Sequence, residues 1–121
     1  MATIPKSWDA VQTFQDKAHV ITWTPLAVGD VGEQVEMTGA ADRSVQVFGT
    51  FGVGGTVLFE GSNDGQNWST LNTPQGTPVA FTSSKILGVL ELSRFVRPRV
   101  SIGDGTTSVS IVALFRRVNS Q

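Results

Sequence analysis

Apolar and polar side chains alternate along short segments of this sequence, and glycine-rich turns separate the segments. Such alternation occurs in Ser108–Val118, where every second side chain from Val109 to Phe115 is apolar. Successive side chains of a strand point to opposite faces, so this spacing predicts a half-buried β-strand. No stretch has the apolar spacing of a helix of about 12 residues, and we therefore expect an all-β fold. The inward-facing residues of this last segment are expected to be Val109, Ile111, Ala113 and Phe115.

The composition agrees with β-structure. The 121 residues include 16 valines, 5 isoleucines and 13 threonines, whose branched Cβ atoms suit the pleated surface of a sheet. A chain of this length forms one domain with its own core. It contains no cysteine, which excludes a disulfide scaffold, a thiolate nucleophile, a zinc–thiolate site and an iron–sulfur cluster. We expect a β-sandwich or jelly roll of about eight strands.

Strands are expected wherever the alternation lies between turn residues. The expected strands are His19–Thr24, Ser44–Phe51, Thr56–Gly61, Trp68–Leu71, Val79–Thr82, Phe95–Ile102 and Ser108–Val118, a short strand around Val35, and Ile86–Leu92 as a strand or a short helical turn. The Gly52–Gly55 link supplies the positive φ angles of a tight turn, so the two strands that it joins are expected to pair as a hairpin. The Asp64–Gly65 dipeptide predicts a second hairpin. Pro98 cannot donate a ladder hydrogen bond, which predicts an exposed edge or a bulge.

Residues 1–17 have a different pattern. Trp8, Val11 and Phe14 recur at every third position, which predicts one or two helical turns with Ser7 as the N-cap. Such a helix would lie across one end of the core. The alternative is an arm that docks on another molecule, because two large aromatic side chains on a terminal segment need an apolar surface. We therefore divide the chain into an N-terminal arm or short helix, residues 1–17, and a β-sandwich domain, residues 18–121.

Two groups of side chains on the expected strands are candidates for protein contacts. Phe95, Arg97 and Arg99 share one face of their strand, and arginine and aromatic side chains are enriched in interface cores. The alternative is a surface pair of arginines that Glu60 or Glu91 neutralises. On the last strand, Val112 and Leu114 make the outer face apolar as well, so a loop or another subunit is expected to cover it. The core-facing residues of the arginine-bearing strand are expected to be Val96, Val100 and Ile102.

Few residues could support catalysis or bind a metal ion. His19 is the only histidine, no nucleophile-elbow motif accompanies it, and a strand histidine is the simpler interpretation. Glu60, Asp64 and Glu91 could form a pair of catalytic carboxylates, but the chain has three tryptophans and no tyrosine to line a sugar cleft. The Asn63–Asn67 turn lacks the spacing of a calcium loop, and the glycines do not form a phosphate loop. We expect no enzyme, no metal and no cofactor.

The net charge of −1 conceals an uneven distribution of charge along the sequence. Lys85–Arg117 carries six bases and two acids, a net +4, and the remaining residues carry −5. A chain of both signs can pair with copies of itself or with a partner of mixed charge. It lacks a basic run with interleaved aromatics, so nucleic acid is not an expected partner. Met1–Ala10 lacks the apolar run of a secretory signal. No apolar run approaches the ~20 residues that span a bilayer, so we expect a soluble chain without a membrane partner.

Four stretches of the sequence resemble one protein family. Val45–Phe51, Val57–Trp68, Arg94–Val100 and Gly103–Val109 are similar to small structural proteins of tailed bacteriophages, the capsid decoration or cement proteins on the outside of the head shell. The resemblance implies a β-sandwich subunit with no catalytic residue. It also implies synthesis in the host cytoplasm, a place on the outer surface of the virion, and self-association as a homodimer or homotrimer that clamps neighbouring major capsid proteins. The expected capsid or subunit contacts are Trp8, Val11, Phe14, Phe95, Arg97, Arg99, Val112 and Leu114.

Two of these stretches also resemble the discoidin (coagulation factor 5/8 C-type) family of glycan- and lipid-binding sandwiches. In that family a Ser-x-Asp-Gly-x-x-Trp turn and a later aromatic-Val-Arg strand recur, and Ser62–Trp68 and Phe95–Arg97 match them. This chain is short for that family and lacks its cysteines and its aromatic spike loop. The two matching stretches nevertheless make a carbohydrate-binding β-sandwich module the alternative function.

Overall fold

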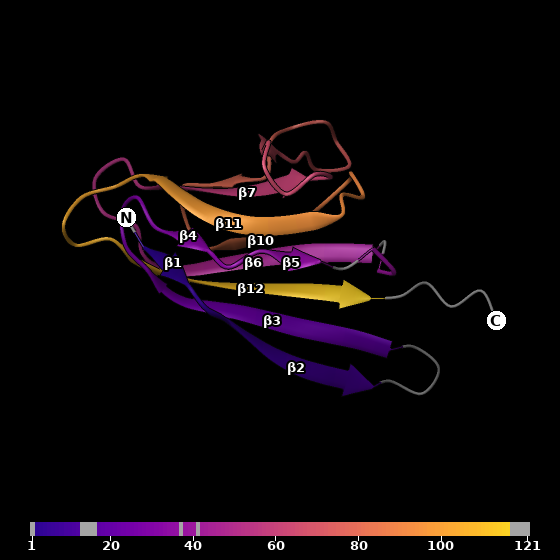
Figure 1. Ribbon diagram of the computed structural model, residues 1–121. Helices are drawn as coiled ribbons and strands as arrows, with labels where there is room; N and C mark the ends of the chain where they lie inside the picture. The colour runs from indigo at the N-terminus through magenta and orange to yellow at the C-terminus, as the bar shows by residue number, and fades with distance from the viewer. Residues whose placement is uncertain (1, 13–16, 37, 41, 117–121) are drawn as a thin grey trace.

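The structure, a computed structural model, describes residues 2–12, 17–36, 38–40 and 42–116. Strands and turns account for the regular structure of these residues, and they form two sheets packed face to face (Figure 1). The expected all-β sandwich is confirmed. Among the described residues there is no helix long and apolar enough to cross a membrane.

The lower sheet of Figure 1 has five strands in the order β10-β6-β12-β3-β2, and all neighbours are antiparallel. Its strands are β2 (Lys6–Gln12), β3 (Lys17–Leu26), β6 (Asp42–Thr50), β10 (Lys85–Gly88) and β12 (Ser108–Arg116). The long strand β12 lies in the centre, where Ile111 pairs with Val47 of β6 and Trp23 of β3. Because these three side chains lie on the same face, this sheet presents a continuous apolar surface to its partner.

The other sheet has seven strands, most of them short, and its strands β7 and β11 lie above β6 and β12 in Figure 1. They are β1 (Thr3–Ile4), β4 (Val31–Gly32), β5 (Val35–Glu36), β7 (Thr56–Ser62), β8 (Ser69–Thr70), β9 (Ala80–Phe81) and β11 (Phe95–Ile102). The long strands β7 and β11 pair antiparallel in its centre. On their flanks, β8 and β9 pair with β7, β4 and β5 pair with β11, and β1 runs parallel to β4.

The core lies between the two sheets and is made of the alternate residues that the sequence pattern predicts. Trp23 is fully buried against Phe59 of the other sheet, with ring centroids 6.3 Å apart, and its indole Nε1 donates to the Glu33 carbonyl at 2.9 Å. Burying one such large side chain contributes roughly 1.5–3 kcal/mol. The four inward residues expected on the last strand are all buried. Other members of the core are Ile21, Val45, Val47, Val57, Phe81, Val96 and Val100.

The expected hairpin between Ser44–Phe51 and Thr56–Gly61 is wrong. β6 pairs with β10 and β12 in the five-stranded sheet, whereas β7 pairs with β11 in the other sheet. The Gly52–Gly55 link therefore crosses from one sheet to the other, although Gly52 and Gly54 have the expected positive φ angles of 77° and 67°. Two strands whose apolar faces oppose each other across a core show the same alternation of side chains as two strands paired in one sheet. The sequence pattern therefore does not distinguish the two arrangements. The hairpin expected at Asp64–Gly65 is confirmed, since β8 returns to pair with β7.

Of the two alternatives expected at Pro98, an exposed edge or a bulge, the exposed edge is wrong, because β11 has partners on both sides. The strand on one side is split into β4 and β5, and Pro98 lies opposite the split, where no ladder hydrogen bond is required. An irregularity in pairing follows between Val100 and Ile102. This bulge turns Ile102 outward, so that it is 55% exposed and not in the core as predicted.

The short helix expected within residues 1–17 is not formed by the described residues 2–12, which make strands β1 and β2. β2 is an edge strand of the five-stranded sheet and pairs with β3 over its whole length. Phe14 and the side chain of Val11 lie outside the described part of the structure. The expected end of a strand at Thr24 is wrong as well, since β3 continues through a cis Thr24–Pro25 bond to Leu26.

Candidate functional site

The outer face of the seven-stranded sheet carries a cluster of two arginines and one glutamate. Arg97 pairs with Glu60 in the ladder between β11 and β7, and Arg99 follows two residues later on the same face. The Arg97 Nε donates to one carboxylate oxygen of Glu60 at 3.1 Å, and the Arg99 Nε donates to the other at 2.8 Å. Glu60 is only 5% exposed, so the two guanidinium groups cover the carboxylate that holds them. We call Arg97 and Arg99 the arginine pair.

Aromatic side chains flank the arginine pair. The Arg97 guanidinium lies over the Trp68 ring, 4.1 Å from its centroid, a cation–π contact. The third expected residue, Phe95, is on the same face of β11, and Arg94 lies 4.9 Å from its ring centroid. Arg94 is held separately by Glu36 at 2.7 Å. The structure thus places Phe95, Arg97 and Arg99 together as expected and adds Trp68, which the sequence interpretation missed.

The outer face of the five-stranded sheet is apolar in its centre. Leu114 is 41% exposed, and its ladder partners are Val20 of β3 and Ser44 of β6. We call this surface the apolar face, and its residues are Val20, Phe48, Ile86, Val112 and Leu114. Between them lie uncharged polar residues such as Gln46. Leu114 is exposed, so no loop within the described residues covers it, and cover by another subunit stays a prediction.

A shallow cavity of about 220 Å³ lies at one end of the apolar face. It is lined by Asp42, Arg43, Ser44, Leu114 and Arg116. Arg116 pairs with Asp42 across the ladder. The ion pair of Asp42 and Arg116 therefore lies next to the apolar residues at this end of the face.

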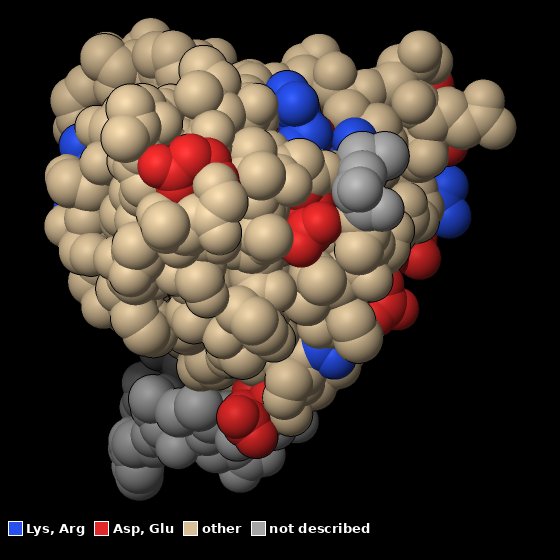
Figure 2. Space-filling view, turned by 90° about the vertical axis from the view of Figure 1, so that its left-hand side faces the viewer, with Lys and Arg blue, Asp and Glu red and all other residues tan. Residues whose placement is uncertain are grey.

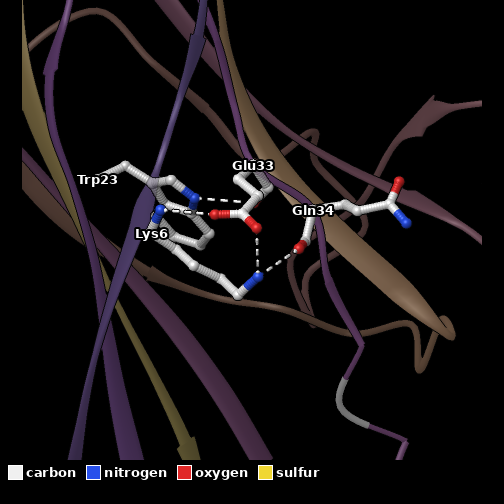
Figure 3. Close-up of polar contacts among 4 residues, drawn as sticks. All are labelled: Lys6, Trp23, Glu33 and Gln34. Carbon is white, nitrogen blue, oxygen red and sulfur yellow. Dashed lines mark hydrogen bonds and ion pairs between the residues drawn. The ribbon is translucent and has the colours of Figure 1, made fainter.

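Two carboxylates beside β4, Asp30 and Glu33, hold the N-terminal strands to the seven-stranded sheet. Glu33 accepts hydrogen bonds from the Lys6 amide at 3.1 Å and from the Lys6 Nζ at 2.9 Å, and the same Nζ reaches the Gln34 carbonyl (Figure 3). The Lys6 side chain, followed by its amide, holds the pKa of Glu33 below its usual value. Asp30 accepts from the Ala2 amide with one oxygen. Residues 2–6 consequently bridge the open side between the sheets.

Trp8 of the N-terminal segment is 45% exposed. It packs edge-on against His19 of β3, with ring centroids 5.2 Å apart. The partly exposed histidine therefore has an aromatic neighbour.

The carboxylates considered for catalysis are each engaged in holding a loop or the arginine pair. Asp64 accepts from the backbone amides of Asn67 and Gln66 and from the side chains of Asn67 and Ser62, and these bonds hold its pKa well below the usual range. Glu91 accepts from the backbone and side chain of Asn72, which also lowers its pKa. Among the described residues, no three histidine, aspartate or glutamate side chains form a group that could hold a metal ion.

A polar cleft of about 380 Å³ lies beside the turn between β7 and β8. It is lined by Gly61, Ser62, Asn63, Asn67, Ser69, Leu71, Glu91, Leu92 and Ser93. Several of these polar groups have partners within the chain: the Asn63 side chain accepts from the Arg94 amide, and Asn67 donates to Asp64. The lining contains no aromatic side chain.

No protein-family model matches the sequence, and no curated protein matches it. Among solved structures the fold is similar to the SPBc2 prophage-derived protein YomS, with a TM-score of 0.62 and 11% identity over 89% of this chain and 99% of that one. FeII HppE gives a TM-score of 0.38 at 11% identity, over 91% of this chain and 49% of that one. A carbohydrate-binding module of Cellvibrio mixtus lichenase 5A, in complex with cellotriose, gives 0.33 at 11%, over 94% and 87%. The first likeness shows a shared fold, and the other two are too weak to support an argument.

Proposed function

We propose that this chain is a non-enzymatic virion protein that decorates the outside of a bacteriophage head. In this role it binds neighbouring major capsid proteins as a homodimer or homotrimer and stabilises the contacts between them. The sequence resemblance to capsid decoration proteins motivates the proposal, and the sandwich fold that the chain shares with a prophage-derived protein is compatible with it.

The apolar face is the observation that carries this function. Exposed apolar side chains gathered on one sheet face, here Phe48, Ile86 and Leu114, are costly to leave in water, and clusters of this kind mark contact sites. A modest interface buries roughly 800 Å² per partner. A small oligomer that makes several such contacts gains avidity without any one of them being strong.

The end of the sandwich at which β11 and β12 are joined also suits a protein that works by contact. In Figure 2 this end is mostly uncharged, and its acidic and basic side chains are scattered over it rather than gathered in one patch. Low charge density lowers the desolvation cost of covering a surface. Val53, which is 82% exposed, lies in the link between β6 and β7 at this end.

The test is binding to heads assembled without this protein. Purified wild-type protein is expected to co-sediment with such heads, and a Val112→Ser, Leu114→Ser double variant is expected to bind at least about tenfold more weakly. Both side chains point away from the core, so the variant should keep its melting temperature. Leu90→Ser is the matched control, since it also removes an exposed apolar side chain but lies off the apolar face, and it should bind like wild type.

Two results would contradict the proposal. One is a wild-type protein that does not bind heads at all. The other is a folded double variant that binds as tightly as wild type, which would remove the apolar face from the contact.

The alternative, a carbohydrate-binding module, is favoured by the polar cleft beside the β7–β8 turn. Hydroxyl, amide and carboxylate groups such as Ser69, Asn67 and Glu91 are the kinds that bind sugar hydroxyls. Saturable binding on a glycan array that Ser69→Ala weakens would support this function. An array without hits at high protein concentration would count against it.

A further inference from the structure

We propose that the arginine pair is a binding site for a side-chain carboxylate presented by an acidic segment of a partner protein. The proposal deepens the decoration function, and only the identity of the partner rests on that function. The site itself is defined by Arg97, Arg99, Glu60 and Trp68.

Glu60 holds the two guanidinium groups side by side. Each of its oxygens accepts from one Nε, at 3.1 Å from Arg97 and 2.8 Å from Arg99. Register explains this arrangement, because Arg97 is opposite Glu60 in the ladder while Arg99 is opposite Leu58, which puts the carboxylate between the two side chains. The conformational cost of aligning two long side chains is thus met before any ligand arrives.

The hydrogen-bonding groups that remain are those that recognise a carboxylate. Glu60 occupies the Nε of each arginine, and among the described residues no protein atom accepts from their terminal nitrogens. The Arg97 and Arg99 side chains are 24% and 37% exposed, so water reaches them. A guanidinium carries four N–H bonds on its terminal nitrogens, in a planar fork that fits a carboxylate through two parallel hydrogen bonds.

The charge of the cluster favours a carboxylate over a nucleic acid. Two arginines face a single buried glutamate, which leaves one positive charge unbalanced. Arg94 cannot add to it, because Glu36 already neutralises it at 2.7 Å. One incoming carboxylate makes the cluster neutral, whereas a nucleic acid brings a row of phosphates to a face with one spare charge. Trp68 packs on Arg97 at 4.1 Å and fixes that guanidinium further.

The experiment is a titration of the full-length protein with a synthetic hexaglutamate peptide at low ionic strength. The Nε–H signals of Arg97 and Arg99 are followed by NMR, and hexaglutamine serves as the uncharged control. We expect hexaglutamate to shift both signals and hexaglutamine to shift neither. Arg99→Gln is expected to weaken binding at least about tenfold, and Arg99→Lys, which keeps the charge but loses the fork, severalfold.

Arg94→Gln is the matched control, because it removes the same charge from a neighbouring position outside the cluster. It should leave the affinity for hexaglutamate within about twofold. Equal losses in Arg94→Gln and Arg99→Gln would mean that net charge alone is sensed and would overturn the proposal. Tighter binding of inorganic phosphate or of a single-stranded oligonucleotide to the same two arginines would overturn the assignment to a carboxylate. Arg99→Lys supplies the decisive comparison if Arg99→Gln does not fold.

Binding to heads separates this proposal from the function on which it rests. Hexaglutamate binding that depends on Arg99, in a protein that does not bind heads, would support the site and contradict decoration. Head binding that Arg99→Gln leaves unchanged, with no hexaglutamate binding, would contradict the site and leave decoration standing.

Discussion

Asp104 shows how a single exposed carboxylate organises the loop end of the sandwich. It accepts from the hydroxyl of Thr106 at 2.6 Å, from the Thr106 amide at 2.8 Å, and from the Val53 amide in the link between the sheets at 2.9 Å. The hydroxyl and amide of Thr106, together with the Val53 amide, lower the pKa of Asp104 from 3.8 to about 2. The charged carboxylate is therefore the form that joins the two loops.

The lowered pKa of Asp104 predicts a pH-dependent contribution to stability. A carboxyl group with a lower pKa in the folded state stabilises the fold above its unfolded pKa of 3.8 and loses this effect as the pH falls to about 2. Asp104→Asn should therefore melt a few degrees below wild type at neutral pH. This difference should shrink as the pH falls through that window. Melting curves at several pH values measure it, and a difference that persists unchanged at the lowest pH would contradict the prediction.

The shared face of the arginine pair could be predicted from the alternation of residues along one strand, but its aromatic neighbour, Trp68, could not. Alternation along one strand is enough to put Phe95, Arg97 and Arg99 on one face and to suggest an acid such as Glu60 opposite them. The position of Trp68 depends on how the turn after Ser62 returns over the sheet, which is set by the register of β8 on β7. The spacing between residues within one strand does not contain that information.

At the scale of elements, strands were easier to predict than their partners. The pattern of Ser44–Phe51 and Thr56–Gly61 gives two strands with apolar faces, and the structure contains both as β6 and β7. It cannot say whether those faces meet in one sheet or across the core. In the N-terminal segment the type of element was predicted wrongly. Apolar residues at every third position suggested a helix, whereas pairing with β3 makes this segment a strand. Tertiary pairing outweighs a weak local pattern over so few residues.

The link between β6 and β7 leads to a prediction about its glycines. A Cβ atom on Gly55 would lie 1.9 Å from the Phe51 carbonyl oxygen, and backbone atoms cannot move aside as a flexible side chain can. Gly55→Ala should therefore destabilise the fold by at least about 2 kcal/mol. Gly105→Ala is the control, because a Cβ there meets no atom within 4 Å. Chemical denaturation of both variants measures the effect, and equal stability of the two would show that the link tolerates a side chain.

At the scale of the whole molecule, the uneven charge along the sequence is resolved by pairing within the chain. Acids of the negative part meet bases of the positive part: Glu36 binds Arg94, Glu60 binds the arginine pair, and Asp42 binds Arg116. β11 and β12 are consecutive but lie in different sheets, so their arginines end on opposite outer faces. The net +4 of Lys85–Arg117 therefore forms no single basic patch among the described residues.

This division gives the sandwich two outer faces of different chemistry. The seven-stranded sheet presents ionic groups with one spare positive charge, and the five-stranded sheet presents the apolar face. Interactions between exposed charges are screened by salt, whereas apolar contacts are not weakened by it. A protein that uses both faces to bind a head should therefore show a salt response that separates them.

Head binding by the wild type should weaken severalfold between about 0.05 M and about 0.5 M NaCl and then level off, because the screened part of the contact is lost and the apolar part remains. Arg99→Gln should bind more weakly at low salt and respond little to further salt, since the variant lacks the paired guanidinium groups. The Val112→Ser, Leu114→Ser variant should keep the salt response and lose the residual binding at high salt. Co-sedimentation across a salt series measures all three. An Arg99→Gln variant with the full wild-type salt dependence would place the ionic contact elsewhere on the molecule.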